Sequence, residues 1–192
     1  MTTADGHRLT ADIATPTGAP AEASGGVVVC HPHPRYGGDR FNPVVDAVFR
    51  HLPALGFTTL RFDFRSEFGD GVGERLDVIA ALDALDDRAA GPLAVVGYSF
   101  GAAVALGVAD ERIGAVVAIA PPLAMFTVVP PSVPVLLLTP QHDQFTPPAD
   151  AAHATADWPD VELRTVESVD HFLVGRASHV ATAAGHWLTG RH

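Results

Sequence analysis

The chain has 192 residues, of which 47% are hydrophobic and 18% charged, and its formal net charge is −10. These values are typical of one soluble globular domain, so we expect a single domain over residues 1–192 without long disordered arms. An acidic chain without a cluster of Lys and Arg lacks the basic surface that nucleic acid requires, and no apolar run reaches the length of a membrane helix. The first residues also lack the pattern of a secretory signal, so we expect a cytoplasmic protein, either a monomer or a small homo-oligomer.

Short apolar runs alternate along the chain with amphipathic stretches, and Gly or Pro residues separate them. The apolar runs predict strands at residues 7–14, 27–30, 58–64, 93–96, 115–119, 133–138 and 161–166, with a loop at 15–25. The amphipathic stretches predict helices at residues 43–55, 74–88, 100–109, 148–158 and 176–189. This alternation is typical of parallel strands joined by right-handed crossovers, so we expect an α/β fold with a mostly parallel sheet of about six to seven strands, flanked by helices on both faces.

Two of the predicted helices carry more detailed signals. Asn42, followed by a proline, is a typical helix cap, and Pro53 is expected to distort the last turn of the helix that Asn42 opens. In the helix at 74–88, apolar residues recur at helical spacing, and we expect the acidic residues between them to face solvent. These acidic residues are Asp77, Asp83, Asp86 and Asp87.

The strongest chemical signal is the sequence Gly97-Tyr98-Ser99-Phe100-Gly101, which follows an apolar strand and precedes a helix of small residues. In that context a Gly-x-Ser-x-Gly sequence predicts a nucleophile elbow, a strained turn that holds the serine hydroxyl clear of the backbone. The start of the helix favours developing negative charge, and the backbone N–H of Phe100 is one expected oxyanion donor. We therefore predict Ser99 as a nucleophile, with an ordinary strand–helix turn as the alternative.

A serine hydroxyl needs a base, and after a nucleophile elbow the chain order predicts first an acid and then a histidine. His171 follows the last predicted strand, from where it can reach Ser99 across the top of the sheet. Asp143 is the only carboxylate in the loop after the strand at 133–138, and we predict that it orients the imidazole. A turn or capping role is the alternative for Asp143, and Asp150 is the weaker candidate acid. Three competing histidines are expected to face solvent: His179, His186 and His192.

The second oxyanion donor is expected in the loop after the strand at 27–30, which runs His31-Pro32-His33-Pro34-Arg35-Tyr36-Gly37-Gly38. Its prolines have no N–H to donate, so we predict the N–H of His33 as the donor and that of Arg35 as the second choice. The two histidines also resemble a metal pair. Two loop histidines with only Asp39 nearby are a weak metal signal, so we expect no metal and no other cofactor.

Further residues are expected to surround this site. Arg61-Phe62-Asp63-Phe64-Arg65 ends a strand, and its charged side chains are expected to form structural ion pairs, with binding of a substrate carboxylate as the alternative. The segment at 121–132 is too short for a lid domain, which predicts an open or shallow pocket. Four side chains are the candidates for contacting substrate: Arg35, Tyr36, Phe126 and Phe145.

Taken together, these residues resemble the small bacterial α/β-hydrolases that open with a His-Pro-His-Pro loop, a group distantly similar to dienelactone hydrolases. The resemblance covers nearly the whole chain, and the motifs recur in the right order. They are His31-Pro32-His33-Pro34, Tyr36-Gly37-Gly38, Asn42, Val44-Val45, Arg61 to Arg65, Gly73-Glu74, Gly97 to Gly101, Asp143 and His171-Phe172. The resemblance implies the α/β-hydrolase fold without a lid domain, a Ser-Asp-His site, and hydrolysis of an ester or related acyl bond.

The prediction is therefore a carboxylesterase-like serine hydrolase that acts on a small-molecule acyl substrate through an acyl-enzyme. An acyltransferase, thioesterase, lactonase or perhydrolase on the same site is one alternative, because the fold does not separate these reactions. A non-catalytic binding protein with this fold is a second alternative, and a metal-dependent hydrolase that uses His31 and His33 is a third.

Overall fold

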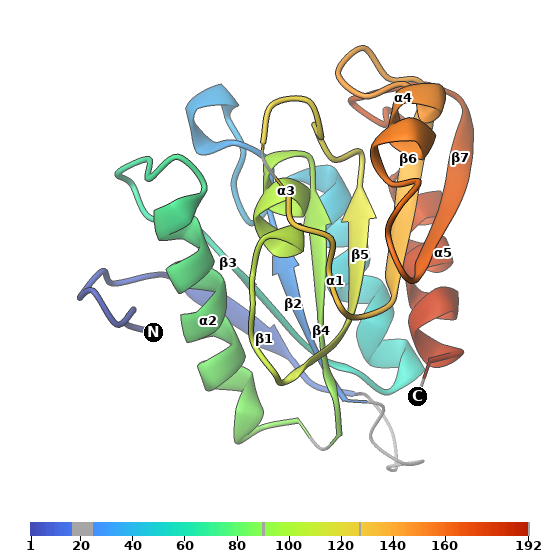
Figure 1. Cartoon of the computed structure of the whole chain (residues 1–192). Helices are drawn as coiled ribbons and strands as arrows, with labels where there is room; N and C mark the ends of the chain where they lie inside the picture. The colour runs from blue at the N-terminus through green and yellow to red at the C-terminus, as the bar shows by residue number, and fades with distance from the viewer. Residues whose placement is uncertain (17–24, 90, 127, 192) are drawn as a thin grey trace.

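The computed structural model of the chain describes residues 1–16, 25–89, 91–126 and 128–191, so most of the loop predicted at 15–25 lies outside the described residues. Its strands form one seven-stranded sheet in the order β1-β3-β2-β4-β5-β6-β7 (Figure 1). They are β1 (Ala11–Ala14), β2 (Gly26–Cys30), β3 (Thr58–Phe62), β4 (Leu93–Tyr98), β5 (Ile113–Ile119), β6 (Val135–His142) and β7 (Val161–Asp170). Only β1 pairs antiparallel, with β3, and the other described pairs are parallel, which confirms the predicted mostly parallel sheet.

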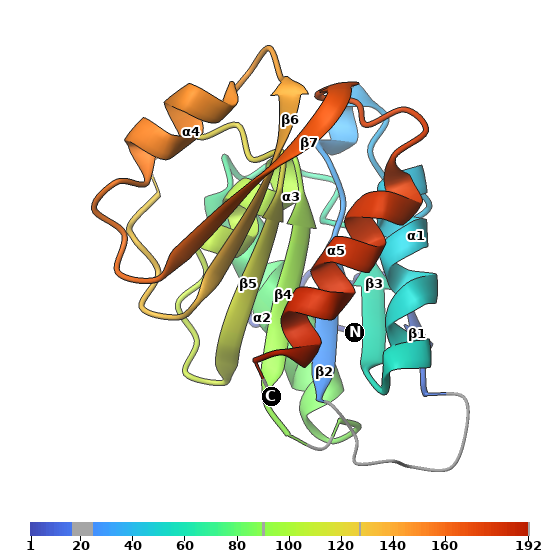
Figure 2. The same ribbon diagram turned by 90° about the vertical axis from the view of Figure 1, so that its right-hand side faces the viewer.

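Helices cover both faces of this sheet, as predicted. They are α1 (Pro43–His51), α2 (Val72–Asp86), α3 (Phe100–Leu106), α4 (Pro148–Ala154) and α5 (Ala177–Thr189). Figure 2 shows α1 and α5 together on one face and α2, α3 and α4 on the other. Each face has its own core, because successive side chains of a strand point to opposite sides: Val27 and Val29 pack toward α1 and α5, whereas Val28 and Cys30 pack toward α2 and α3.

Some element boundaries differ from the prediction for physical reasons. The helix that Asn42 caps ends at His51, and a 3₁₀ turn that contains Pro53 replaces its last turn, as expected from the missing proline N–H. Strand β6 runs four residues past Leu138, to His142, and β7 continues beside it to Asp170. Five of the eight added residues are exposed, and together they carry no hydrophobic period, so the pattern of the sequence did not reveal them.

One prediction for the aspartates of the second helix was wrong. Asp77 was expected in solvent, but it is fully buried and accepts hydrogen bonds from the side chain of Arg65 (2.8 Å from Nη2) and from its backbone N–H (2.9 Å). A buried carboxylate is stable only when it is paired, and helical periodicity does not show a partner that lies on another element. Asp83, Asp86 and Asp87 are exposed, as predicted.

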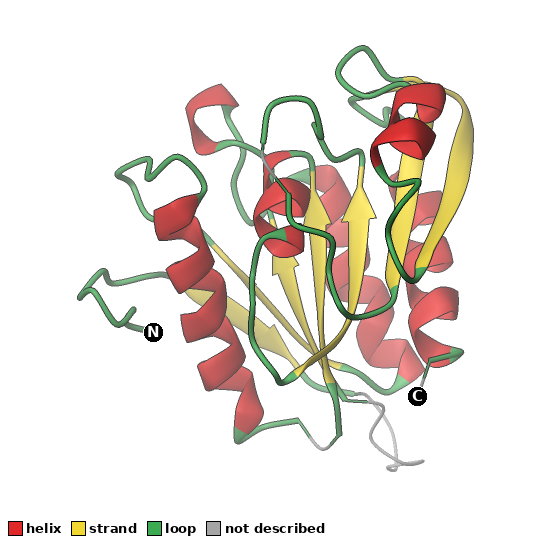
Figure 3. Ribbon diagram, in the orientation of Figure 1, coloured by secondary structure: helices red, strands yellow, loops and turns green. Residues whose placement is uncertain are grey.

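The strand order determines where the loops meet. From β2 the chain goes to β3 on one side, and it then returns to β4 on the other side of β2. The carboxyl ends of β2 and β4 therefore lie at a topological switch point, the usual ligand position in an open α/β sheet. Their following loops gather with others above the sheet in Figure 3. Residues 120–134 connect β5 to β6 and contain no helix in their described part, and among the described residues no helix is both long and apolar enough to cross a membrane.

Candidate active site

Ser99 lies at the sharp turn between β4 and α3, with a backbone φ of 53° and ψ of −118°. A positive φ is unfavourable for a residue with a side chain and is characteristic of strained functional turns. The flanking glycines make the turn possible. A Cβ at Gly97 would lie 2.3 Å from the carbonyl oxygen of Gly101, and a Cβ at Gly101 would lie 2.5 Å from the carbonyl oxygen of His31. The sequence Gly-x-Ser-x-Gly is therefore a steric requirement of this strand–helix approach.

A chain of short contacts links Ser99 to two buried side chains. Ser99 Oγ lies 2.8 Å from Nε2 of His171, and Nδ1 of His171 lies 2.9 Å from Oδ2 of Asp143. His171 is 5% exposed and Asp143 is 3% exposed, so water competes little for either contact. If Nδ1 carries the proton that it donates to Asp143, Nε2 is left to accept the hydroxyl proton of Ser99.

Neighbouring groups hold the imidazole and the carboxylate in place. Oδ1 of Asp143 accepts hydrogen bonds from the backbone N–H groups of Phe145 (2.8 Å) and Thr146 (3.1 Å). The Tyr98 hydroxyl donates to the carbonyl oxygen of His171 at 2.9 Å, and the Phe145 ring meets the imidazole at a centroid distance of 4.5 Å. Burial raises the pKa of Tyr98, so its hydroxyl stays protonated and keeps this bond.

The competing residues lie elsewhere. Asp150 is exposed in the first turn of α4, and His179 and His186 are exposed on α5. His192 lies outside the described residues. The structure thus brings Ser99, His171 and Asp143 together and leaves their described competitors apart.

Two backbone N–H groups are available near Ser99. The N–H of Phe100, in the first turn of α3, and the N–H of His33 have no partner among the described residues. The N–H of Arg35 donates instead to Nδ1 of His33 at 3.1 Å, and those of Tyr36 and Gly38 donate to the His33 carbonyl oxygen. This arrangement favours His33 over Arg35 as the donor from this loop.

His31 has a structural role that the sequence did not show. Its Nε2 accepts a hydrogen bond from the backbone N–H of Phe64 at 3.0 Å, and its Nδ1 contacts the carbonyl oxygen of Pro32. Burial lowers the pKa of His31, which keeps the ring neutral as these two contacts require. Because both ring nitrogens are engaged, His31 does not pair with His33 as a metal ligand.

A pocket of about 490 Å³ opens at Ser99. It is lined by Pro32, His33, Tyr36, Gly37, Gly38, Asn42, Tyr98, Ser99, Met125, Phe145, His171 and Phe172. Tyr36 and Phe145 were predicted here. Arg35 and Phe126 were also predicted, but Arg35 lies over the Phe68 ring at 4.9 Å and Phe126 packs on Phe100 at 5.6 Å, outside this pocket.

Other lining residues, among them Asn42 and Phe172, were not predicted as substrate contacts. Asn42 was recognised only as a cap, and its Oδ1 does accept from the N–H of Val44 at 3.0 Å. Its amide nitrogen has no hydrogen-bond acceptor among the described residues. Among the described residues, no Asp, Glu, Lys or Arg side chain lines the pocket, so it suits an uncharged group next to the reacting bond.

The charged residues that end β3 form ion pairs, as predicted. Arg61 bonds Asp12 (3.0 Å) and Asp46 (2.6 Å), and Asp63 pairs with Arg40. Arg65 bonds Asp77 and also Asp5 (2.8 Å). These guanidinium groups are already paired with carboxylates, which favours the structural interpretation over binding of a substrate carboxylate.

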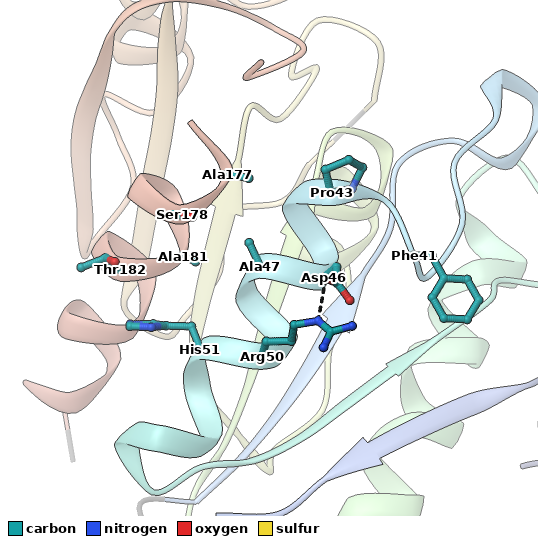
Figure 4. A pocket seen from close by; sticks show the side chains of 10 residues that line it. All are labelled: Phe41, Pro43, Asp46, Ala47, Arg50, His51, Ala177, Ser178, Ala181 and Thr182. Atoms are coloured by element: carbon teal, nitrogen blue, oxygen red, sulfur yellow. Dashed lines mark hydrogen bonds and ion pairs between the residues drawn. The ribbon is translucent and has the colours of Figure 1, made fainter. Parts of the chain in front are cut away.

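A second hollow, of about 630 Å³, lies between α1 and α5. Figure 4 shows its lining, which includes the small residues Ala47 on α1 and Ala181 on α5. On α1, Arg50 bonds Asp46 at 2.7 Å. None of the residues of the Ser99–His171–Asp143 chain lines it, so we assign no reaction to it.

The chain was compared with known proteins. No family model matches it. A curated relative, an uncharacterized protein of Rickettsia prowazekii (strain Madrid E), is 38% identical over 106 residues, which cover 50% of this chain and 44% of that protein. The chain therefore matches less than half the length of this relative.

Solved structures cover the chain more completely. An α/β serine hydrolase homologue from Coxiella burnetii is similar with a TM-score of 0.84 and 28% identity, over 94% of this chain and 91% of that one. A lidless α/β serine hydrolase from Xanthomonas campestris has a TM-score of 0.83 and 27% identity, over 93% of this chain and 87% of that one. An esterase from Pyrococcus furiosus shares the fold at 19% identity, with a TM-score of 0.78 over 99% of this chain and 90% of that one. The predicted α/β-hydrolase fold is confirmed. The two serine hydrolase neighbours support a hydrolase-type function.

Proposed function

We propose that this protein is a serine hydrolase that cleaves an ester or related acyl bond, with Ser99 as nucleophile, His171 as base and Asp143 as the orienting acid. The observation that carries the proposal is the chain of two contacts from Ser99 Oγ through the imidazole to the Asp143 carboxylate, at 2.8 and 2.9 Å. Both distances lie in the range of hydrogen bonds that transfer or orient a proton.

The mechanism follows from this geometry. His171 Nε2 removes the Ser99 proton while Oγ attacks the substrate carbonyl, and the resulting imidazolium is stabilised by Asp143. The backbone N–H groups of Phe100 and His33 bind the developing oxyanion. His171 then protonates the departing alcohol, which leaves an acyl group on Ser99. Water, deprotonated by the same imidazole, attacks this acyl-enzyme and releases the acid.

The side chains that line the pocket indicate which class of substrate it fits. Tyr36, Met125 and Phe172 are 87%, 64% and 60% exposed, and they form an apolar rim that an apolar acyl or alcohol group would cover. Burial of such surface is worth about 25 cal/mol per Å². We therefore infer a carboxylesterase-like activity on small acyl esters that are uncharged next to the reacting bond, in keeping with the resemblance to the His-Pro-His-Pro group of hydrolases.

The test is covalent labelling of the wild-type protein by a fluorophosphonate probe, with turnover of p-nitrophenyl acetate measured in parallel. Wild type is expected to be labelled and to turn over the ester, and Ser99→Ala to do neither. Ser178→Ala is the matched control, since Ser178 is exposed on α5 and does not line the Ser99 pocket. Absence of labelling in wild type, or equal labelling of Ser99→Ala, would contradict the proposal and favour a binding protein with this fold.

A further inference from the structure

Arg75 has an unusual position on α2. The residue is partly buried, and its Nε is fully buried without a hydrogen-bond partner among the described residues. A buried donor that lacks a partner is destabilising, and native proteins rarely retain one without a reason. The rest of the guanidinium also has no carboxylate partner in the described part of the chain.

The other arginines show that this is an exception. Every other described arginine that is not exposed bonds at least one aspartate: Arg40, Arg61, Arg65 and Arg112. The chain contains 22 acidic residues and only 12 Lys and Arg, so carboxylates are plentiful. A partly buried guanidinium that no described carboxylate reaches is free to bind an anion from outside the protein.

Arg75 lies beside two hollows. A Cβ at Gly107 would stand 2.7 Å from Arg75 Cζ, so a residue without a side chain gives the guanidinium its room against the end of α3. One hollow, of about 220 Å³, includes Gly107 and Asp110 in its lining beside Arg75. The other, of about 420 Å³, is lined by Arg75 together with Phe68, Asp70, Val72, Met125 and Phe126. Most of this lining is apolar, which suits a hydrocarbon or aromatic stem that ends in a charged group.

This hollow adjoins the pocket at Ser99. Met125 lines both of them. Phe68 of the hollow packs on the imidazole of His33, at a centroid distance of 4.7 Å, and His33 lines the Ser99 pocket. A substrate whose carbonyl lies at Ser99 can therefore extend past Met125 toward Arg75.

We propose that Arg75 is an anion subsite of the Ser99 pocket, and that it selects esters whose acyl group ends in a carboxylate or phosphate. This inference rests on the serine hydrolase function proposed above. The planar guanidinium matches both oxyanions through paired N–H donors, and the apolar walls on Phe68 and Phe126 reduce competition from water. Asp70 also lines the hollow, but it is exposed, so its repulsion of an anion is screened and does not close the subsite.

The test compares p-nitrophenyl esters of six-carbon acyl chains that end in a methyl group, a carboxylate or a phosphate. The measured quantity is the ratio of kcat/KM for each anionic ester to that for the neutral ester. A charge-assisted hydrogen bond is worth about 1.5–3 kcal/mol, so Arg75→Gln is expected to lower the ratio by about tenfold or more. The ester with the larger wild-type ratio identifies the carboxylate or the phosphate as the preferred group.

Two further variants test the subsite even if Arg75→Gln does not fold. Arg88→Gln removes the same charge beyond the other end of α2, away from both hollows, and is expected to leave the ratio unchanged. Asp70→Asn removes the negative charge from the hollow and is expected to raise the ratio; asparagine tolerates the positive φ of 54° at this position.

Different results would overturn the Arg75 subsite and the serine hydrolase function. Ratios that agree within twofold among wild type, Arg75→Gln and Asp70→Asn, in proteins that still label at Ser99, would overturn the subsite and leave the hydrolase intact. Lack of turnover of every ester, together with lack of labelling in wild type, would overturn the hydrolase itself.

Discussion

The carboxylate of Asp143 holds the imidazole of His171 with one oxygen and the backbone of its own turn with the other. Oδ2 lies 2.9 Å from Nδ1 of His171, and Oδ1 accepts from the N–H groups of Phe145 and Thr146. The turn therefore sets the direction of the carboxylate, and the carboxylate sets the tautomer of the imidazole. This division of work between the two oxygens predicts what a conservative substitution should do.

Asp143→Asn is expected to lower kcat for p-nitrophenyl acetate by about 10⁴-fold with little loss of stability. The amide oxygen can still accept the two backbone N–H groups, so the turn is kept. The amide nitrogen then faces Nδ1 and donates to it, which moves the imidazole proton to Nε2 and prevents Nε2 from accepting the Ser99 proton.

Asp150→Asn is the control, because Asp150 is exposed on α4 and should change kcat by less than about twofold. Thermal unfolding of both variants checks the fold. Retention of kcat within tenfold in Asp143→Asn would show that another group orients His171.

The parts of this site that the sequence predicts are those encoded by local constraints. Gly97 and Gly101 are required because their missing Cβ atoms leave room for backbone, so the elbow is visible as a motif. The order of strands then predicts which loops hold Asp143 and His171. Sequence alone does not show which side chains from separate loops meet, so the place of Asn42 in the pocket and of Arg65 beside Asp77 emerges only from the folded chain.

The close packing at the nucleophile elbow predicts a loss of stability when a side chain is added there. Gly101→Ala is expected to lower the free energy of unfolding by about 1–3 kcal/mol or more, because the new methyl group would stand 2.5 and 2.6 Å from the carbonyl oxygens of His31 and Cys30. Neither backbone atom can move without shifting β2 against α3. Urea unfolding measures the change.

Gly190→Ala is its matched control. Gly190 has φ −80° and ψ −2°, and an added Cβ would meet nothing closer than 3.6 Å, so the change should stay within about 0.5 kcal/mol. Equal stability of the two variants would mean that β2 and α3 do not approach each other as closely as these distances require.

His31 predicts a dependence of stability on pH. Burial lowers its pKa below the ordinary 6.5, so in the folded protein it resists protonation. Below about pH 6.5 the unfolded chain takes up a proton at this residue that the folded chain does not, so stability falls as the pH decreases toward the lowered pKa. The slope from this one group is at most about 1.4 kcal/mol per pH unit.

The measurement is the free energy of unfolding between pH 7.5 and 5 for wild type and for His31→Gln, which cannot titrate at this position. Glutamine weakens the bonds to Phe64 and Pro32, so the variant should be less stable throughout, but its stability should fall less over this range. Parallel curves would show that His31 is protonated equally in both states.

The last prediction concerns the oxyanion donor from the loop after β2. His33 has φ −58°, close to the value of about −65° that a proline ring imposes, and its N–H has no partner among the described residues. His33→Pro therefore removes the N–H while it keeps the backbone direction. Loss of one oxyanion donor lowers kcat by about 10²–10³-fold, and KM should change little because the bond forms in the transition state.

His33→Ala separates the N–H from the side chain. It keeps the N–H but removes the imidazole, which accepts from the Arg35 N–H and packs on Phe68 and Phe100. A loss of kcat that is much larger in His33→Pro than in His33→Ala, with both proteins folded by circular dichroism, identifies the backbone N–H as the donor. Equal losses in the two variants would assign the effect to the imidazole and its packing, and the second donor would then have to come from another loop at the ends of the strands.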